Sequence, residues 1–199
     1  GDTNGALAAF QKVLQIEPKN VASLYLRAQL FAAQHKFAEA TNDLQTILTI
    51  DPKNVAALIK LAEIASQQNR DGDVRNLLAK ATSVAPSNPT PRLALARYLA
   101  SKKDNKAALA AASETVRVLP NNSDALALTG DLQLALGQKK EAIATFQRLT
   151  SLTPQSARAR LLLANALFGA GDRAGAADAL NTAASLDPKS GDVYAAQIN

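Results

Sequence analysis

The sequence predicts an all-α protein, a right-handed α-solenoid in which antiparallel helix-turn-helix units stack one after another. Two observations lead to this prediction. The apolar residues are mostly Ala and Leu, which favour helices, while aromatic residues make up only 4% of the chain. In addition, a proline recurs every 34 residues, and a fixed period of this length is typical of paired-helix repeats. These prolines are Pro18, Pro52, Pro86, Pro120, Pro154 and Pro188.

Each proline lies between two predicted helices. Proline lacks a backbone N–H and so ends the preceding helix, and two residues later the side-chain oxygen of an Asn or Ser can cap the next helix. Residues 1–20 match only the turn and second helix of a repeat, and residues 191–199 only the start of a first helix. We therefore expect residues 1–199 to form one array that is a piece of a longer one. With proline at position 32 of the unit, the complete repeats are 21–54, 55–88, 89–122, 123–156 and 157–190.

The repeat positions indicate which side chains pack inside. Small residues recur at positions 8 and 20, where the two helices of a unit could approach closely. Apolar residues recur at positions 24 and 30, which predicts a buried stripe on the second helix. Position 15 holds Gly, Asn, His or Lys, a set that leans toward residues tolerating a positive φ in a tight turn. Pro89 and Pro91 fall in the first turn of a helix, so we expect that helix to have a shortened or bent start.

This pattern resembles the tetratricopeptide repeat family, whose unit of the same length is a helix-turn-helix with small residues at positions 8 and 20, bulky residues at 4, 7, 11 and 24, and proline at 32. The repeat at 123–156 matches well, for example through Gly130 and Phe146. The chain departs from the family where polar residues take packing positions, as Arg27 and Thr129 do at position 7. We expect the contacts between helices to be thinner at those places.

The composition of the chain argues against most kinds of catalytic and metal-binding site. The chain has no cysteine and a single histidine, His35, which excludes a disulfide, a thiolate zinc site, a cysteine nucleophile and a histidine cluster for a metal. The glycine-rich segment 169–175 is a turn between helices in this register, because phosphate-binding glycine loops follow a strand. Asp71 and Asp73 lie at a predicted helix start, where the helix dipole favours negative charge. We therefore predict no catalytic residue, no cofactor and no metal, and no apolar run is long enough to span a bilayer.

The family resemblance implies that first-helix side chains line a concave face. Positions 5 and 12 form two largely apolar rows there, and position 9 forms a polar row between them. Because equivalent positions of neighbouring units are close, Arg97 could pair with Glu63 and Asp131, in which case the polar row would only fix repeat stacking. The predicted binding surface consists of Tyr25, Gln29, Ile59, Lys60, Glu63, Leu93, Arg97, Asp131, Leu134, Arg158, Leu161, Asn165 and Phe168.

These features favour a non-catalytic scaffold that binds protein or peptide segments on the concave face. One alternative is a module that recruits substrates for an enzyme lying outside this chain. Another is a binder of phosphate-rich ligands through basic turns, since the net charge is +5 and the pI about 9.6. Nucleic acid is disfavoured because the basic residues form no dense stripe with aromatics. The dibasic turn residues are Lys102, Lys103, Lys139 and Lys140.

A narrower resemblance rests on the amino-acid composition of two segments rather than on a defined motif. The Ala- and Leu-rich segments 156–165 and 142–149 are similar to the repeat lipoprotein found with PEP-CTERM/exosortase and exopolysaccharide systems in bacteria. That resemblance implies an exported, membrane-anchored scaffold in the periplasm or cell envelope, with its lipidated cysteine upstream of this chain. Without it, a cytoplasmic location is expected. Uncapped ends also allow self-association of the array.

Overall fold

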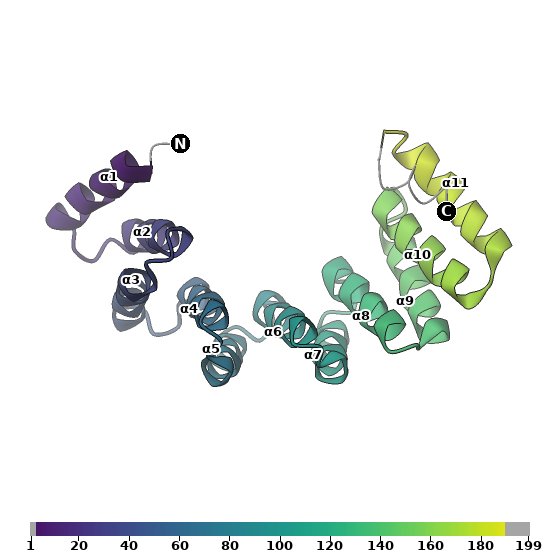
Figure 1. Cartoon of the computed structure of the whole chain (residues 1–199), viewed down its shortest axis with the longest axis horizontal. Helices are drawn as coiled ribbons and strands as arrows, with labels where there is room; N and C mark the ends of the chain where they lie inside the picture. Colours follow the sequence, from purple (N-terminus) through teal and green to yellow (C-terminus); the bar gives the residue numbers. More distant parts are fainter. Residues whose placement is uncertain (1–2, 190–199) are drawn as a thin grey trace. The chain divides into compact units, whose positions relative to one another are not determined.

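A computed structural model describes residues 3–189, which form eleven α-helices and no strand (Figure 1). None of these helices is both long and apolar enough to cross a membrane. The fold class predicted from the sequence is confirmed. The helices are α1 (Thr3–Ile16), α2 (Val21–Ala33), α3 (Phe37–Ile50), α4 (Val55–Gln67), α5 (Asp71–Val84), α6 (Thr90–Ser101), α7 (Asn105–Val118), α8 (Ser123–Ala135), α9 (Lys139–Leu152), α10 (Ala157–Ala170) and α11 (Arg173–Leu186).

The chain divides into two compact units, and the division falls within α6. The N-terminal unit ends at Leu95 and contains α1 to α5, and the C-terminal unit begins at Ala96 and contains α7 to α11. In the N-terminal unit α2 packs against α3 and α4 against α5, and in the C-terminal unit α8 packs against α9 and α10 against α11. Each of these pairs is the first and second helix of one repeat. Helix α1 is a second helix that packs against the next first helix, α2.

Side-chain caps start the first helices as the sequence predicts. Asn20 accepts a hydrogen bond from the N–H of Ser23 at 2.9 Å, which satisfies one of the free N–H groups of α2. The same bond, from the N–H three residues ahead, is made by Asn54, Asn122 and Ser156. A polar residue two positions after the proline is therefore sufficient to begin each of these helices.

The repeat that contains Pro89 and Pro91 begins differently. Its capping residue Asn88 accepts the N–H of Thr90 at 3.0 Å, only two residues ahead, and α6 starts at Thr90 rather than directly after the cap. Pro91, the residue three ahead of Asn88, has no N–H to donate, so Asn88 accepts the N–H of Thr90 instead. The expected shortened start is confirmed.

The turn between the two helices of a repeat requires a left-handed residue at position 15. In the described residues φ at this position is positive in every complete repeat, which confirms the prediction. Three of the five residues carry a side chain, although glycine adopts this conformation at lower cost. The φ values are 58° at His35, 56° at Asn69, 63° at Lys103, 75° at Gly137 and 90° at Gly171. The glycine that occupies this position at the start of the chain, Gly1, lies outside the described residues.

Small residues bring the two helices of a repeat together. All residues at position 8 are buried, and so are those at position 20 from Ala40 onward. In the repeat of α8 and α9, Gly130 leaves room for the ring of Phe146, which is fully buried at position 24. Position 24 is buried in all the complete repeats but the last, where Leu180 is half-buried.

The prediction that position 30 belongs to the buried stripe is wrong. Ile16 is 82% exposed, and Ile50 and Leu152 are each 38% exposed. Position 30 is the last residue of the second helix, so no following turn covers its side chain. The apolar stripe of the second helix therefore stops one turn earlier than its sequence pattern suggests.

We expect Gly130→Ala to destabilise the protein by about 1–3 kcal/mol, because the new methyl group would lie 2.5 Å from Cζ of Phe146. Replacing Phe146 by Leu in the same chain should restore much of the loss, since Ala at position 8 already faces Leu at position 24 in the pair Ala28 and Leu44. Urea unfolding followed by circular dichroism measures the effect.

Gly169→Ala is the matched control for this substitution. Gly169 lies in α10 with open space where its Cβ would be, so alanine should stabilise the helix by about 0.5–1 kcal/mol. A Gly130→Ala variant that is as stable as Gly169→Ala would show that helix propensity, and not the close approach to Phe146, determines the residue at position 8.

Candidate functional site

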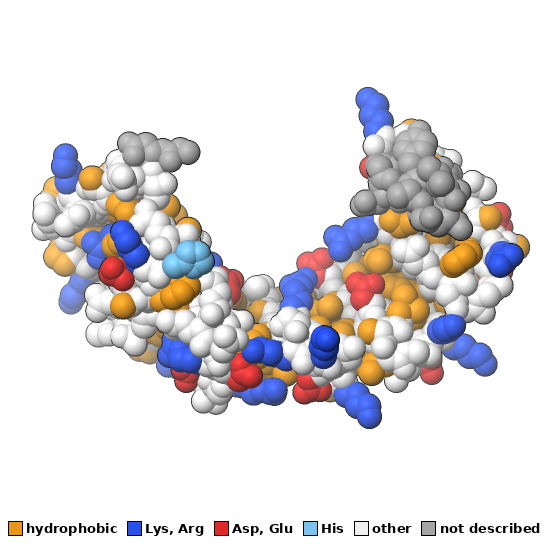
Figure 2. Space-filling model, in the orientation of Figure 1, with side chains coloured by type: hydrophobic (Ala, Val, Ile, Leu, Met, Phe, Trp, Pro, Cys, Tyr) orange, Lys and Arg blue, Asp and Glu red, His pale blue; other side chains and the backbone are white. Residues whose placement is uncertain are grey.

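The first helices of the C-terminal unit present part of the predicted binding surface. Helices α8 and α10 belong to successive repeats and contact one another, so that equivalent positions on them are neighbours. Phe168 is 57% exposed, and Leu134 and Leu161 are half-buried. Figure 2 shows hydrophobic side chains gathered over these helices and interrupted by charged ones. The predicted residues in this unit's α8 and α10 are Asp131, Leu134, Arg158, Leu161, Asn165 and Phe168.

Asp131 occupies a partly desolvated place on α8. Burial of its carboxyl group raises its pKa above the ordinary value of 3.8, and the positive charge of Arg158 on α10 lowers it by a smaller amount. Asp131 is exposed, and the described residues include no ion pair to its carboxylate. Asp131 is thus suited to accept a positively charged group or an N–H donor from outside.

We expect Asp131→Asn to make the protein slightly more stable than the native chain at neutral pH. The pKa of Asp131 is higher in the folded than in the unfolded state, so ionisation costs more in the folded state and the native chain loses stability as pH rises through that pKa. Below the ordinary pKa of 3.8 both states are protonated, and the difference between the two chains should vanish. Unfolding in urea at acidic and at neutral pH measures it.

Asp178→Asn serves as the control, because Asp178 is an exposed acidic residue on α11. A loss of stability in Asp131→Asn at neutral pH would instead mean that the attraction between Asp131 and Arg158 exceeds the desolvation cost.

The N-terminal unit holds a second group of predicted residues. Tyr25 on α2 is half-buried and packs against the core of the unit, and Ile59 on α4 is also half-buried. Gln29 is half-buried, whereas Leu93 on α6 is only 3% exposed. The prediction that Leu93 offers a binding surface is therefore wrong, because its side chain belongs to the core.

The pairing of charges along position 9 that the sequence allowed is not formed between Arg97 and Asp131 in the described residues. Glu63 forms an ion pair with Lys60 three residues earlier on the same helix. Arg97 is exposed, and the described part of the C-terminal unit contains no ion pair between it and Asp131. A lysine one turn away on the same helix reaches Glu63 without depending on the neighbouring repeat.

Sequence analysis missed two features. Leu26 lies at position 6 on α2 and is 44% exposed. The predicted binding residues come from positions 5, 9 and 12, and the charged residues Lys60 and Arg158 are the only others. The second feature is the polar residue Arg27, which was expected to weaken helix packing. Its partner Asp43 follows 16 residues later, and an opposite charge at that spacing was the available signal.

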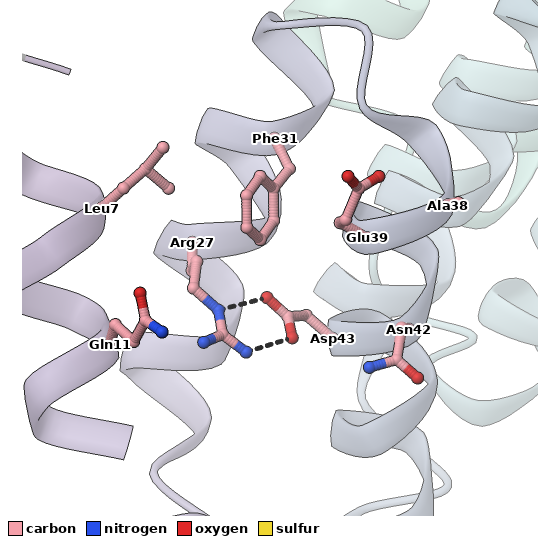
Figure 3. A pocket seen from close by; sticks show the side chains of 8 residues that line it. All are labelled: Leu7, Gln11, Arg27, Phe31, Ala38, Glu39, Asn42 and Asp43. Carbon is pink, nitrogen blue, oxygen red and sulfur yellow. Dashed lines mark hydrogen bonds and ion pairs between the residues drawn. The ribbon is translucent and has the colours of Figure 1, made fainter. Parts of the chain in front are cut away.

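Arg27 and Asp43 join α2 to α3 through a two-pronged ion pair (Figure 3). Nε and Nη2 of Arg27 donate to the two carboxylate oxygens of Asp43 at 2.8 and 2.7 Å. The carboxylate is 2% exposed, while the guanidinium is 22% exposed and lies 5.8 Å from the ring centre of Phe31. This hydrogen bonding to Asp43 raises the pKa of Arg27, so the guanidinium stays charged. Position 7 here replaces apolar packing with a directed polar contact.

We expect Arg27→Ala to destabilise the protein by about 3 kcal/mol, because it leaves the buried carboxylate of Asp43 without a partner. The double variant Arg27→Leu/Asp43→Leu should recover most of this loss, since an apolar pair restores the family's usual packing at this interface. Thermal unfolding of the two variants and the native chain makes the comparison. If the double variant were as unstable as the single one, a steric defect rather than an unpaired charge would be responsible.

The residues that the sequence analysis considered for catalysis, metal binding or phosphate binding have structural roles. His35 is an exposed turn residue whose ring packs edge-on against Phe37 at 5.6 Å. Asp73 lies in the first turn of α5 and is 2.8 Å from Arg70, and Gly171 is the left-handed end of α10. In the described residues no group of three or more His, Cys, Asp or Glu side chains could hold a metal ion.

Two of the four lysines predicted to lie in turns have partners within the chain. Lys139 donates to the backbone carbonyl of Gly169, near the end of α10, where positive charge is favoured. Lys102 lies 5.6 Å from the ring centre of Tyr98. Lys103 adopts the left-handed turn conformation described above. Of these four lysines, Lys102 and Lys103 lie in a turn, whereas Lys139 and Lys140 are the first residues of α9.

Paired helices with small residues at their crossings, left-handed turns and a period set by proline define a helical repeat scaffold. The chain belongs to the tetratricopeptide repeat family, whose models match residues 31–98 in one case and 1–55, 93–157 and 128–191 in another. Members of this family are generally scaffolds for protein–protein interaction. Among curated proteins no significant match is found.

Solved structures share the fold at low sequence identity. The crystal structure of YrrB is described as that of a TPR protein with an unusual peptide-binding site. Its sequence is 18% identical, its TM-score is 0.66, and the match covers 96% of this chain and 98% of YrrB. PilW, described as a widely conserved type IV pilus biogenesis factor, is 18% identical with a TM-score of 0.76, and the match covers 98% of this chain and 91% of PilW. Yeast Tom70 is 21% identical with a TM-score of 0.77, and the match covers 96% of this chain but 43% of Tom70.

Proposed function

We propose that the chain is a scaffold that binds a peptide or protein segment on the face formed by its first helices. In the C-terminal unit, the apolar side chains on α8 and α10 anchor the segment, and polar side chains between them set its direction and register. Phe168 and Leu161 are the main anchors, with Leu134 beside them. Asp131 and Asn165 supply hydrogen bonds, and Arg158 supplies a positive charge at one edge.

The exposure of Phe168 carries this proposal. The Phe168 side chain is 57% exposed, so a partner could bury it, and aromatic residues dominate the binding energy of protein interfaces. The peptide-binding site named for YrrB is consistent with this use of the fold. Asp131 adds an exposed carboxylate that can accept a hydrogen bond from an incoming donor.

The N-terminal unit offers a corresponding face on α2 and α4. Tyr25 and Ile59 are its half-buried apolar residues, and Gln29, Lys60 and Glu63 are its polar ones. Leu26 joins them, because it is exposed on the same helix as Tyr25. Arg97 on α6 carries an exposed charge but lies in the C-terminal unit, so it is not part of this N-terminal face. This face binds by the same combination of apolar anchors and polar guides.

The test compares partner capture from a lysate by the native chain and by the double variant Phe168→Ala/Leu161→Ala. We expect the affinity for a captured partner, measured afterwards with purified components, to fall at least tenfold, as truncation of an interface anchor typically costs about 2 kcal/mol or more. Leu152→Ala is the control, because Leu152 is exposed on a second helix. A partner that binds the double variant and the control equally well would refute the proposed face, provided that both chains are equally helical.

We propose the bacterial cell envelope, within an exopolysaccharide assembly system, as the setting of this scaffold. The similarity of segments 142–149 and 156–165 to the envelope lipoprotein supports this setting. Sequencing of the complete gene tests it. An export signal with a lipidation cysteine upstream is expected, and a leaderless cytoplasmic start would refute it.

A further inference from the structure

A groove on the N-terminal unit lies away from the proposed first-helix face. Its larger part is a cavity of about 530 Å³ bordered by α1, α2 and α3, and its smaller part is a cavity of about 360 Å³ that shares Gln11, Arg27, Asn42 and Asp43 with it. Figure 3 shows the larger part, with α1 and α3 as walls and Arg27 and Phe31 rising between them from α2. We name the two parts together the α1–α3 groove. Its volume is within the range of ligand sites in proteins, roughly 300–1,000 Å³.

We propose that the α1–α3 groove binds an extended peptide segment that carries a lysine or arginine side chain. None of the thirteen residues predicted for the first-helix face borders this groove, so the site is independent of that face.

The walls of the groove carry side-chain amides at a helical spacing. Gln11 and Gln15 lie four residues apart on α1, and Asn42 faces them from α3. Each amide can both donate and accept a hydrogen bond, as a peptide backbone does. Four residues of helix rise about 6 Å. Two residues of an extended chain advance about 6.6 Å, which is the repeat of backbone groups that face the same side. The two spacings match closely enough for successive amides to pair with one strand edge.

The floor of the groove offers further donors. Two of the five N–H groups of the Arg27 guanidinium bind Asp43, and the other three have no acceptor among the described residues. The side chain is held in place by its ion pair and by Phe31, so a backbone carbonyl that enters the groove meets a positioned donor. Leu7 and Phe31 form the apolar part of the lining. An apolar side chain of the peptide can be buried there.

The charge of the groove favours a basic segment. Arg27 and Asp43 neutralise each other, and Glu39 is exposed on the same wall as Asn42 without a cation partner among the described residues. The lining therefore has one net negative charge from one cation and two carboxylates, while the whole chain carries +5. A lysine or arginine of the peptide would place its charge near Glu39 and beside the ring of Phe31.

Two peptide pools test the proposal with the full chain labelled with ¹⁵N. The pools are acetyl-X-X-Lys-X-X-amide and acetyl-X-X-Glu-X-X-amide, in which X is Ala, Leu, Ser or Gln. We expect the Lys pool to shift the side-chain amide signals of Gln11, Gln15 and Asn42 in a saturable way, with at least fivefold higher affinity than the Glu pool. The Glu39→Gln variant should lose this preference, and added salt should weaken it.

Matched variants separate this groove from the rest of the surface. Asn42→Leu should reduce the affinity at least tenfold, while Asn76→Leu, at the same position of the next repeat, should leave it within twofold. The variant Phe168→Ala/Leu161→Ala should bind the Lys pool normally, so failure of the first-helix proposal would leave this result unchanged. The proposal is overturned if no saturable shift appears at the three amides, or if Asn42→Leu and Asn76→Leu behave alike. It is also overturned if the amide signals shift with protein concentration alone, because a second copy of the chain would then occupy the groove.

Discussion

The close approach of the two helices within each repeat is the contact on which the rest of the structure depends. At Gly130 the crossing leaves so little space that the Phe146 ring fills the place of a side chain. Elsewhere Ala takes this position and a smaller residue faces it, as Ala28 and Leu44 do. Once the crossing is fixed, the outward side chains of each helix are fixed as well, because a helix is rigid over this length. The candidate binding surfaces are consequences of that packing.

Polar residues at packing positions change the character of a repeat without changing its fold. The Arg27–Asp43 pair replaces apolar contact between α2 and α3 and holds the buried carboxylate by two hydrogen bonds. Such a pair specifies how the two helices are oriented more than it stabilises their contact, since the desolvation cost offsets much of the attraction between the charges. It also leaves three N–H donors of Arg27 without an acceptor in the described residues, and an apolar side chain would supply no such donors. The departure from the family pattern therefore supplies the charged donor in the α1–α3 groove.

The two proposed sites use the repeat in different ways. On α8 and α10 the anchors are apolar, and the polar groups lie between them, so binding there would depend mainly on buried apolar area. In the α1–α3 groove the walls carry amides and the floor carries an ion pair, so binding would depend on hydrogen bonds and charge. Salt should affect the second site more than the first. A scaffold with both could hold two segments of different chemistry.

The sequence alone determined the fold class, the helix starts and the turns, because proline, capping Asn or Ser and left-handed residues act through neighbours a few residues away. Asn20 and Gly137 behave as their local chemistry requires. Burial was decided by tertiary structure. Leu93 is in the core and Ile16 is exposed, although both are apolar at repeating positions, since exposure depends on which other helix covers the residue. The partner of Arg27 was likewise settled only by packing, because several acidic residues lie within reach in sequence and only the folded geometry selects Asp43.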